Sequence, residues 1–122
     1  MLGHISLGVR DLAPATQFYD AVLGALGYVR LWTGEGGVGY GAPGGGEELN
    51  IFQRDDAAAP GAGFHVAFLA PDRPAIHAFH AAALANGGTD NGAPGPRPDY
   101  GPAYYAAFVV DPEGHRLEAM LQ

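Results

Sequence analysis

The stretch His4-Ile5-Ser6-Leu7-Gly8-Val9-Arg10-Asp11 recurs 61 residues later as His65-Val66-Ala67-Phe68-Leu69-Ala70-Pro71-Asp72. The same offset relates later pairs: Phe18 and Phe79, Leu23 and Leu84, and Gly27 and Gly88. A constant offset over about 25 positions indicates one structural unit that is used twice without insertion. The repeat also places two histidines, both able to bind metal, at equivalent points of the two units.

Each copy is expected to start with a strand that leads into a helix. Apolar and polar residues alternate over residues 2–9, which is typical of a strand with one buried face. Asp11 suits the N-cap of the following helix, and Gly27 suits its C-cap. The second copy repeats the pattern, with a strand over residues 64–70 and Asp72 as the N-cap.

Short strands separated by glycine-rich turns complete each unit. They are expected at residues 28–33, 38–42 and 48–53, then at 104–110 and 116–121, with one more short strand inside the Pro/Gly-rich loop 91–102. Each unit is then βαβββ. The chain forms one domain, with module one at residues 1–54, a linker at 55–63 and module two at 64–122. The fold class is α+β, with eight strands and the two helices outside.

Alternation also assigns each side chain to one face of its sheet. The odd-numbered residues of 5–9 are apolar and suit the face under the helix, so His4 points to the opposite, concave face. The same reasoning puts His65 on the concave face of the second sheet. In the last strand of each unit, Asn50 and Glu118 alternate with apolar residues and share the concave face.

Composition limits the partners and the location of the protein. The formal net charge of −7 disfavours nucleic acid and anionic membrane surfaces, so a small-molecule ligand is expected. The chain has no cysteine, which excludes a disulfide framework and thiolate chemistry. No signal peptide is recognisable, and no stretch approaches the ~20 apolar residues of a membrane span. A cytoplasmic location is therefore expected.

Three stretches carry a resemblance to a known family: residues 4–12, residues 18–24 and residues 107–118. Together they resemble the glyoxalase / bleomycin-resistance / dioxygenase family, the vicinal oxygen chelate superfamily. The resemblance covers essentially the whole chain. It implies paired βαβββ modules whose sheets curve into a partly open, eight-stranded barrel around a divalent metal.

The resemblance implies metal ligands at the start of each module's first strand and on its last strand. Carried onto this chain, these positions are His4, Asn50, His65 and Glu118. Asn50 stands where glyoxalase I-like members have a carboxylate. Its amide oxygen can coordinate a hard cation but brings no charge, which counts against full glyoxalase I activity. Glu48, expected on the same face, could replace Asn50 as ligand or base.

Two imidazoles and a carboxylate around one cavity suit a divalent transition metal such as Zn, Ni, Mn or Fe. Such an ion can polarise a carbonyl, hold an enediolate or acidify a water. Glu118 would then bind the metal or act as a general base. The alternative is that the motif survives as a scaffold around a metal-free cavity.

Aromatic and basic residues could line a substrate pocket beside these ligands. The candidates are Phe52, Arg97, Tyr100, Tyr104, Tyr105 and Phe108. Strand aromatics also commonly belong to the core. Arg97 and Arg116 either hold an anionic substrate or stay as surface charges. His77 and His80 lie on the second helix, outside the barrel, and His115 is expected to face solvent after a tight turn.

Three functions follow from the resemblance. The first is a metal-dependent lyase or isomerase, similar to lactoylglutathione lyase, that acts on a small oxygenated substrate. The second is a metal-free protein that sequesters an antibiotic-type small molecule. The third is an iron(II) ring-cleaving dioxygenase, because two histidines and a carboxylate are also an iron(II) ligand set. A homodimer is expected, because each sheet has free edges and glyoxalase-like relatives often complete their sites by pairing modules across two chains.

Overall fold

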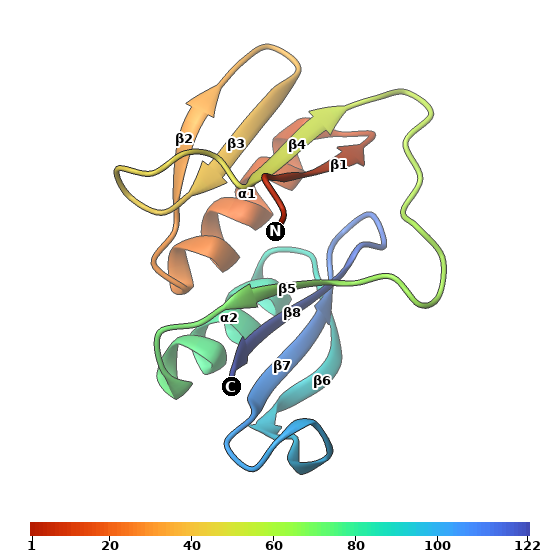
Figure 1. The fold of residues 1–122 in the computed structure, drawn as a ribbon. Helices are drawn as coiled ribbons and strands as arrows, with labels where there is room; N and C mark the ends of the chain where they lie inside the picture. The colour runs from red at the N-terminus through yellow and green to blue at the C-terminus, as the bar shows by residue number, and fades with distance from the viewer.

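A computed structural model describes all residues 1–122 and contains the βαβββ unit twice (Figure 1). The first module consists of β1 (Ile5–Val9), α1 (Leu12–Ala25), β2 (Val29–Thr33), β3 (Gly37–Gly41) and β4 (Leu49–Gln53). The second consists of β5 (Val66–Leu69), α2 (Arg73–Ala85), β6 (Thr89–Pro96), the 3₁₀ turn η1 (Pro98–Tyr100), β7 (Tyr105–Val110) and β8 (Arg116–Leu121). The predicted α+β fold class is confirmed.

The two sheets have the same topology. Their strand orders are β1-β4-β3-β2 and β5-β8-β7-β6, with the first and last strands of each module paired in parallel. Ser6 is the register partner of Asn50, and Ala67 is the partner of Glu118. These are the positions that the sequence repeat relates. The sheets do not pair with each other, so the eight strands form an open, barrel-like arrangement rather than a closed one.

One core joins the two modules. Figure 1 shows α1 and α2 side by side on the same side of the molecule, and the two helices contact each other. The alternate residues of β1 that were expected under the helix, Leu7 and Val9, are buried. A single cluster of 23 buried apolar residues draws on both sheets and both helices. No helix of the protein is both long and apolar enough to span a membrane.

The two helices begin differently, although the sequence predicts an aspartate N-cap for both. The Asp72 side chain accepts a hydrogen bond from the backbone N–H of Ala75 at 2.9 Å. The Asp11 side chain makes no cap bond. Instead, the Glu113 carboxylate of the second module accepts from the backbone N–H groups of Arg10 (2.6 Å) and Asp11 (3.0 Å). The α1 N-terminus is thus held by the other module.

The turn that contains Glu113 also carries a buried polar cluster. Tyr19 of α1 donates to Asp111 Oδ2 at 2.6 Å, and His115 Nδ1 lies 2.8 Å from the same oxygen. Burial raises the pKa of Asp111, but the hydrogen bonds from His115 and Tyr19 outweigh it, so the pKa is lowered. The expectation that His115 faces solvent is wrong: its side chain is buried, because the turn packs against α1 of the other module.

Strand β6 is the short strand expected within the Pro/Gly-rich loop, but it starts earlier, at Thr89. It pairs with β7 through a register that shifts on both sides of Gly92. Gly92 has a φ of 152°, a backbone conformation that L side chains rarely adopt. The shifts let a strand rich in proline and glycine follow β7 to residue 96 and lead into η1.

Candidate functional site on the second sheet

A buried carboxylate and a half-exposed imidazole form the centre of the site. His65 Nε2 lies 2.9 Å from Glu118 Oε1. Tyr104 donates its hydroxyl proton to Glu118 Oε2 at 2.6 Å. The side chain of Glu118 is only 4% exposed, whereas that of His65 is 49% exposed. Glu118 alternates along β8 with buried core residues, so this group lies on the face away from α2.

The hydrogen bonds set the role of each side chain. Both oxygens of Glu118 are engaged, one by the Tyr104 hydroxyl and the other by the His65 ring. Burial and the contact with Glu118 raise the pKa of Tyr104 to about 12, so this hydroxyl stays a donor. With the carboxylate accepting from Nε2–H, neutral His65 carries its lone pair on Nδ1, which has no partner in the protein.

A cavity of about 330 Å³ opens beside His65. Its wall includes Asn91 of β6, Phe108 of β7 and Arg116 of β8. The Phe108 and His65 rings lie 6.2 Å apart in an edge-on arrangement. The guanidinium of Arg97 lies over the same Phe108 ring, 5.5 Å from its centroid. The cavity therefore combines the imidazole of His65, the aromatic surface of Phe108 and the guanidinium of Arg116.

The first sheet presents a different surface at the equivalent positions. Asn50 stands where the second sheet has Glu118, and its Oδ1 accepts from Trp32 Nε1 at 3.1 Å. The Trp32 ring packs against Phe52, with centroids 5.9 Å apart. A Cβ on Gly39 would lie 2.5 Å from Trp32 Cδ1. Glycine at this position therefore makes the space that the indole fills.

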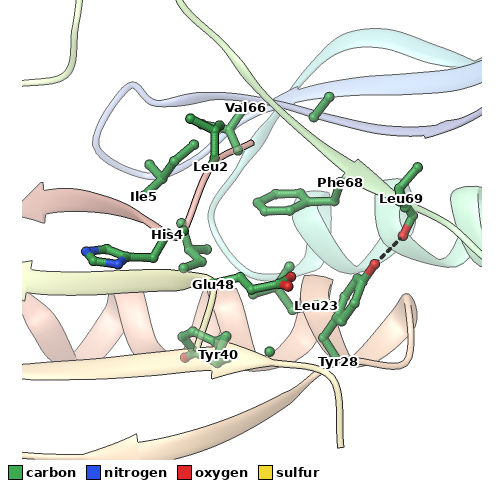
Figure 2. A pocket seen from close by; sticks show the side chains of 14 residues that line it. Leu2, His4, Ile5, Leu23, Tyr28, Tyr40, Glu48, Val66, Phe68 and Leu69 are labelled. Carbon is green, nitrogen blue, oxygen red and sulfur yellow. Dashed lines mark hydrogen bonds between the residues drawn. The ribbon is translucent and has the colours of Figure 1, made fainter. Parts of the chain in front are cut away.

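His4 and Glu48 lie elsewhere, at a cavity of about 260 Å³ between the two modules. Its other walls are mainly apolar side chains of β1, β4, β5 and α1. Figure 2 shows the His4 ring and the Glu48 carboxylate pointing in opposite directions, with Glu48 toward Tyr28. Burial and the charge of Glu48 raise the pKa of Tyr28, whose hydroxyl donates to the carbonyl of Leu69 at 2.8 Å.

These placements allow a test of the metal set that the family resemblance implies. His65 and Glu118 are close enough to share an ion, but His4 lines the other cavity, and the Asn50 oxygen is bonded to Trp32. No three His, Cys, Asp or Glu side chains of the chain gather into a group that could hold a metal. The residues of a single chain in this arrangement therefore do not fit the four-ligand site.

The structure brings together most of the residues expected to line a pocket, but not all. Tyr104, Phe108 and Arg97 lie around the His65–Glu118 pair. Tyr100 is 65% exposed and touches Tyr104 edge-on. Phe52 lies on the first sheet.

Tyr105 does not join the pocket, because it alternates with Tyr104 along the chain. Its side chain is buried on the α2 side of the sheet, and its hydroxyl lies 2.7 Å from His77 Nε2. His80 of the same helix bonds to Asp90 at 2.8 Å. Asn91 also lines the cavity beside His65. The Pro/Gly-rich composition of its segment predicts a loop, and a loop has no alternation that would assign Asn91 to a sheet face.

Comparison with known proteins agrees with this architecture. A model of the Glyoxalase/Bleomycin resistance protein/Dioxygenase superfamily matches residues 1–119. The crystal structure of a glyoxalase/bleomycin resistance protein from Albidiferax ferrireducens T118 is 34% identical, with a TM-score of 0.86 over 100% of this chain and 98% of that chain. No curated protein matches.

More distant structures share the fold. A glyoxalase-related enzyme from Fulvimarina pelagi is 20% identical, with a TM-score of 0.76 over 100% of this chain and 88% of that chain. A glyoxalase/bleomycin resistance protein/dioxygenase family enzyme from Burkholderia phytofirmans PsJN is 19% identical, with a TM-score of 0.73 over 96% of this chain and 94% of that chain.

The fold and the site define a protein built from paired βαβββ modules with a polar site on the face of the second sheet that points away from α2. The chain belongs to the glyoxalase/bleomycin resistance protein/dioxygenase superfamily.

Proposed function

We propose that the protein is a glyoxalase-like lyase or isomerase that binds a small oxygenated molecule beside His65 and moves a proton with the His65–Glu118 pair. The observation that supports this most directly is the hydrogen-bonded series Tyr104–Glu118–His65, in which a buried carboxylate orients a half-exposed imidazole. A base that is held by a third group is the usual arrangement for general acid–base catalysis.

The chemistry follows from the free nitrogen. His65 Nδ1 accepts a proton from a carbon next to a carbonyl, and the Glu118 carboxylate stabilises the imidazolium that forms. Loss of this proton leaves an enediolate, and solvent water exchanges the hydroxyl proton between its two oxygens. The imidazolium then returns its proton to the former carbonyl carbon, which isomerises the substrate. In a lyase the enediolate instead expels a leaving group from the next carbon, and the imidazolium protonates that group. The hydrogen bond from Tyr104 holds the Glu118 carboxylate in place throughout. Glu118 itself is a positioning residue in this scheme.

Solvent deuterium exchange into small α-hydroxyketones and 2-oxoaldehyde hemithioacetals, followed by NMR, tests this proposal. We expect exchange by the parent protein. His65→Ala and Glu118→Gln should lower it about 100-fold, in the range of general-base contributions. Tyr104→Phe should lower it about tenfold, as expected for the loss of one hydrogen bond to a charged group.

His80→Ala is the matched control, because His80 lies on α2 and bonds to Asp90, and neither residue lines the cavity beside His65. It should leave exchange unchanged. Exchange that is equally fast in the parent and in His65→Ala would refute the acid–base role.

A metal-dependent form of the same function needs further ligands beside His65 and Glu118, and we propose that a homodimer would have to supply them. The same requirement holds for an iron(II) dioxygenase. The edge strands β1, β2, β5 and β6 lack a partner on one side, which supports self-association.

Sedimentation at micromolar concentration is expected to show a dimer. Metal analysis and a chelator then separate the two forms. Metal dependence is supported if the protein contains about one metal ion per chain and its melting temperature falls when chelator is added. A metal whose free concentration is a hundredfold above its Kd stabilises the folded state by about 2.7 kcal/mol. A monomer that contains no metal and melts unchanged with chelator supports the metal-free acid–base pair.

The first sheet favours a second candidate, sequestration of an aromatic molecule. Trp32 and Phe52 form an aromatic surface, and Asn50 is engaged with Trp32 rather than free as a ligand. Because Trp32 is the only tryptophan, its fluorescence reports ligand binding there directly. Saturable quenching by a planar aromatic, weakened in Phe52→Ala and without exchange activity, would favour this candidate over the enzyme.

A further inference from the structure

Arg116 has a buried guanidinium nitrogen without a hydrogen-bond partner. Its Nη1 is the only buried side-chain nitrogen or oxygen of the chain that has no hydrogen bond. Neither is its guanidinium part of an ion pair. Buried polar atoms are almost always bonded, and an unmet donor on a charged group is especially unfavourable. The unpartnered, buried Nη1 of Arg116 therefore points to an acceptor group that the chain itself does not supply.

The guanidinium groups of the other five arginines each have a partner in the chain. Arg30 pairs with Asp20 at 2.6 Å. Arg10, Arg54 and Arg97 donate to backbone carbonyls. Arg73 lies over the Tyr105 ring, 4.6 Å from its centroid. Arg116 is thus the exception among six.

The surroundings of Arg116 indicate which kind of group could accept a hydrogen bond from its Nη1. It lines the cavity of about 330 Å³ together with His65, Asn91 and Phe108. The nearest carboxylate on its own strand and face, Glu118, already accepts from His65 and Tyr104. The partner must therefore enter the cavity from outside. A guanidinium presents its donors in a planar fork that matches anionic oxygen groups.

We propose that Arg116 binds the anionic oxygen group, carboxylate or phosphate, of the small molecule that reacts at His65. This inference rests on the proposed function and names its substrate class: an oxygenated compound that carries an anionic group next to an apolar or aromatic body. The Asn91 amide can donate to the same group, and the Phe108 ring offers the apolar wall. His65 then faces the part of the substrate beyond the anion.

Binding of simple probes tests the inference without any need for turnover. Benzoate and phenyl phosphate are titrated against benzyl alcohol, which has a similar body but no charge, with the His65 ring protons followed by NMR. We expect at least one anion to bind ten or more times more tightly than the alcohol, and Arg116→Gln to remove that difference. Arg116→Lys should restore part of it, because lysine keeps the charge but not the fork. Arg73→Gln is the control and should bind like the parent.

Each result decides the inference. Equal binding of the alcohol and both anions by the parent protein would overturn it, and this comparison needs no variant. A change in self-association rather than in anion binding in Arg116→Gln would also overturn it, because the partner of Arg116 would then be a second copy. Anion binding without deuterium exchange would support the role of Arg116 and refute the proposed enzyme activity. Deuterium exchange into uncharged substrates, without any preference for anions, would support the enzyme activity and refute the role of Arg116.

Discussion

Replacing Asp111 by alanine is expected to destabilise the protein by about 3–5 kcal/mol, the range for removing one partner of a buried charged group. The two Asp111 oxygens accept from the Tyr19 hydroxyl, the His115 ring and the backbone N–H groups of Glu113 and His115. Alanine would leave these donors buried and unmet. Urea unfolding followed by far-UV circular dichroism measures the loss.

Two variants set the scale for this result. Asp55→Ala, in the exposed linker, should change stability by about 0.5 kcal/mol or less. Tyr19→Phe removes one hydrogen bond to the same carboxylate and should cost about 1.5–3 kcal/mol. If Asp111→Ala proved as stable as Asp55→Ala, the cluster would not hold α1 to the second module.

The pH dependence of the Asp111 effect has a defined sign. The pKa of Asp111 is lowered in the folded protein, so its ionised form is the one that the fold stabilises. This contribution is fully present above the unfolded-state pKa of about 3.9 and is lost as the pH falls through the lower, folded-state pKa. The difference in stability between the parent and Asp111→Asn should therefore be constant near pH 5 and shrink below about pH 4.

The repeat made much of the fold predictable from sequence. Matched offsets in the first strand and helix predict two equivalent units, and the observed registers of Ser6 with Asn50 and of Ala67 with Glu118 agree with them. Alternation is a local property, so it assigns faces within one strand correctly. The environment of His115 depends instead on how the second module packs against α1. No local pattern contains that information.

The candidate site was predictable only within each module. Alternation predicts that His65 and Glu118 share a face, and the structure shows them hydrogen-bonded. That His4 lines a separate cavity depends on the relative placement of the two sheets, which the family resemblance describes only in general terms. The bond between Asn50 and Trp32 likewise depends on the space left by Gly39, which sequence alone shows only as a glycine in a strand.

Replacing Phe79 by alanine is expected to lower the stability of both modules together, by about 3–5 kcal/mol. Phe79 lies on α2 and is fully buried in the core cluster that spans the two modules. Trp32, the only tryptophan, lies on β2 in the first module. Because one core should unfold as one cooperative unit, the fluorescence of Trp32 is expected to report the full loss. Urea unfolding is measured in parallel by Trp32 fluorescence and by far-UV circular dichroism.

Leu84 provides a matched position on the same helix, because it is 47% exposed. Leu84→Ala should change stability by about 0.5 kcal/mol or less. In Phe79→Ala, the two probes should shift together and stay coincident. A fluorescence midpoint that stays at the parent value while the circular dichroism midpoint falls would show that the modules unfold separately. The contacts of α1 with α2 and of Tyr19 with Asp111 would then be too weak to couple them, and module exchange between two chains would become correspondingly easier.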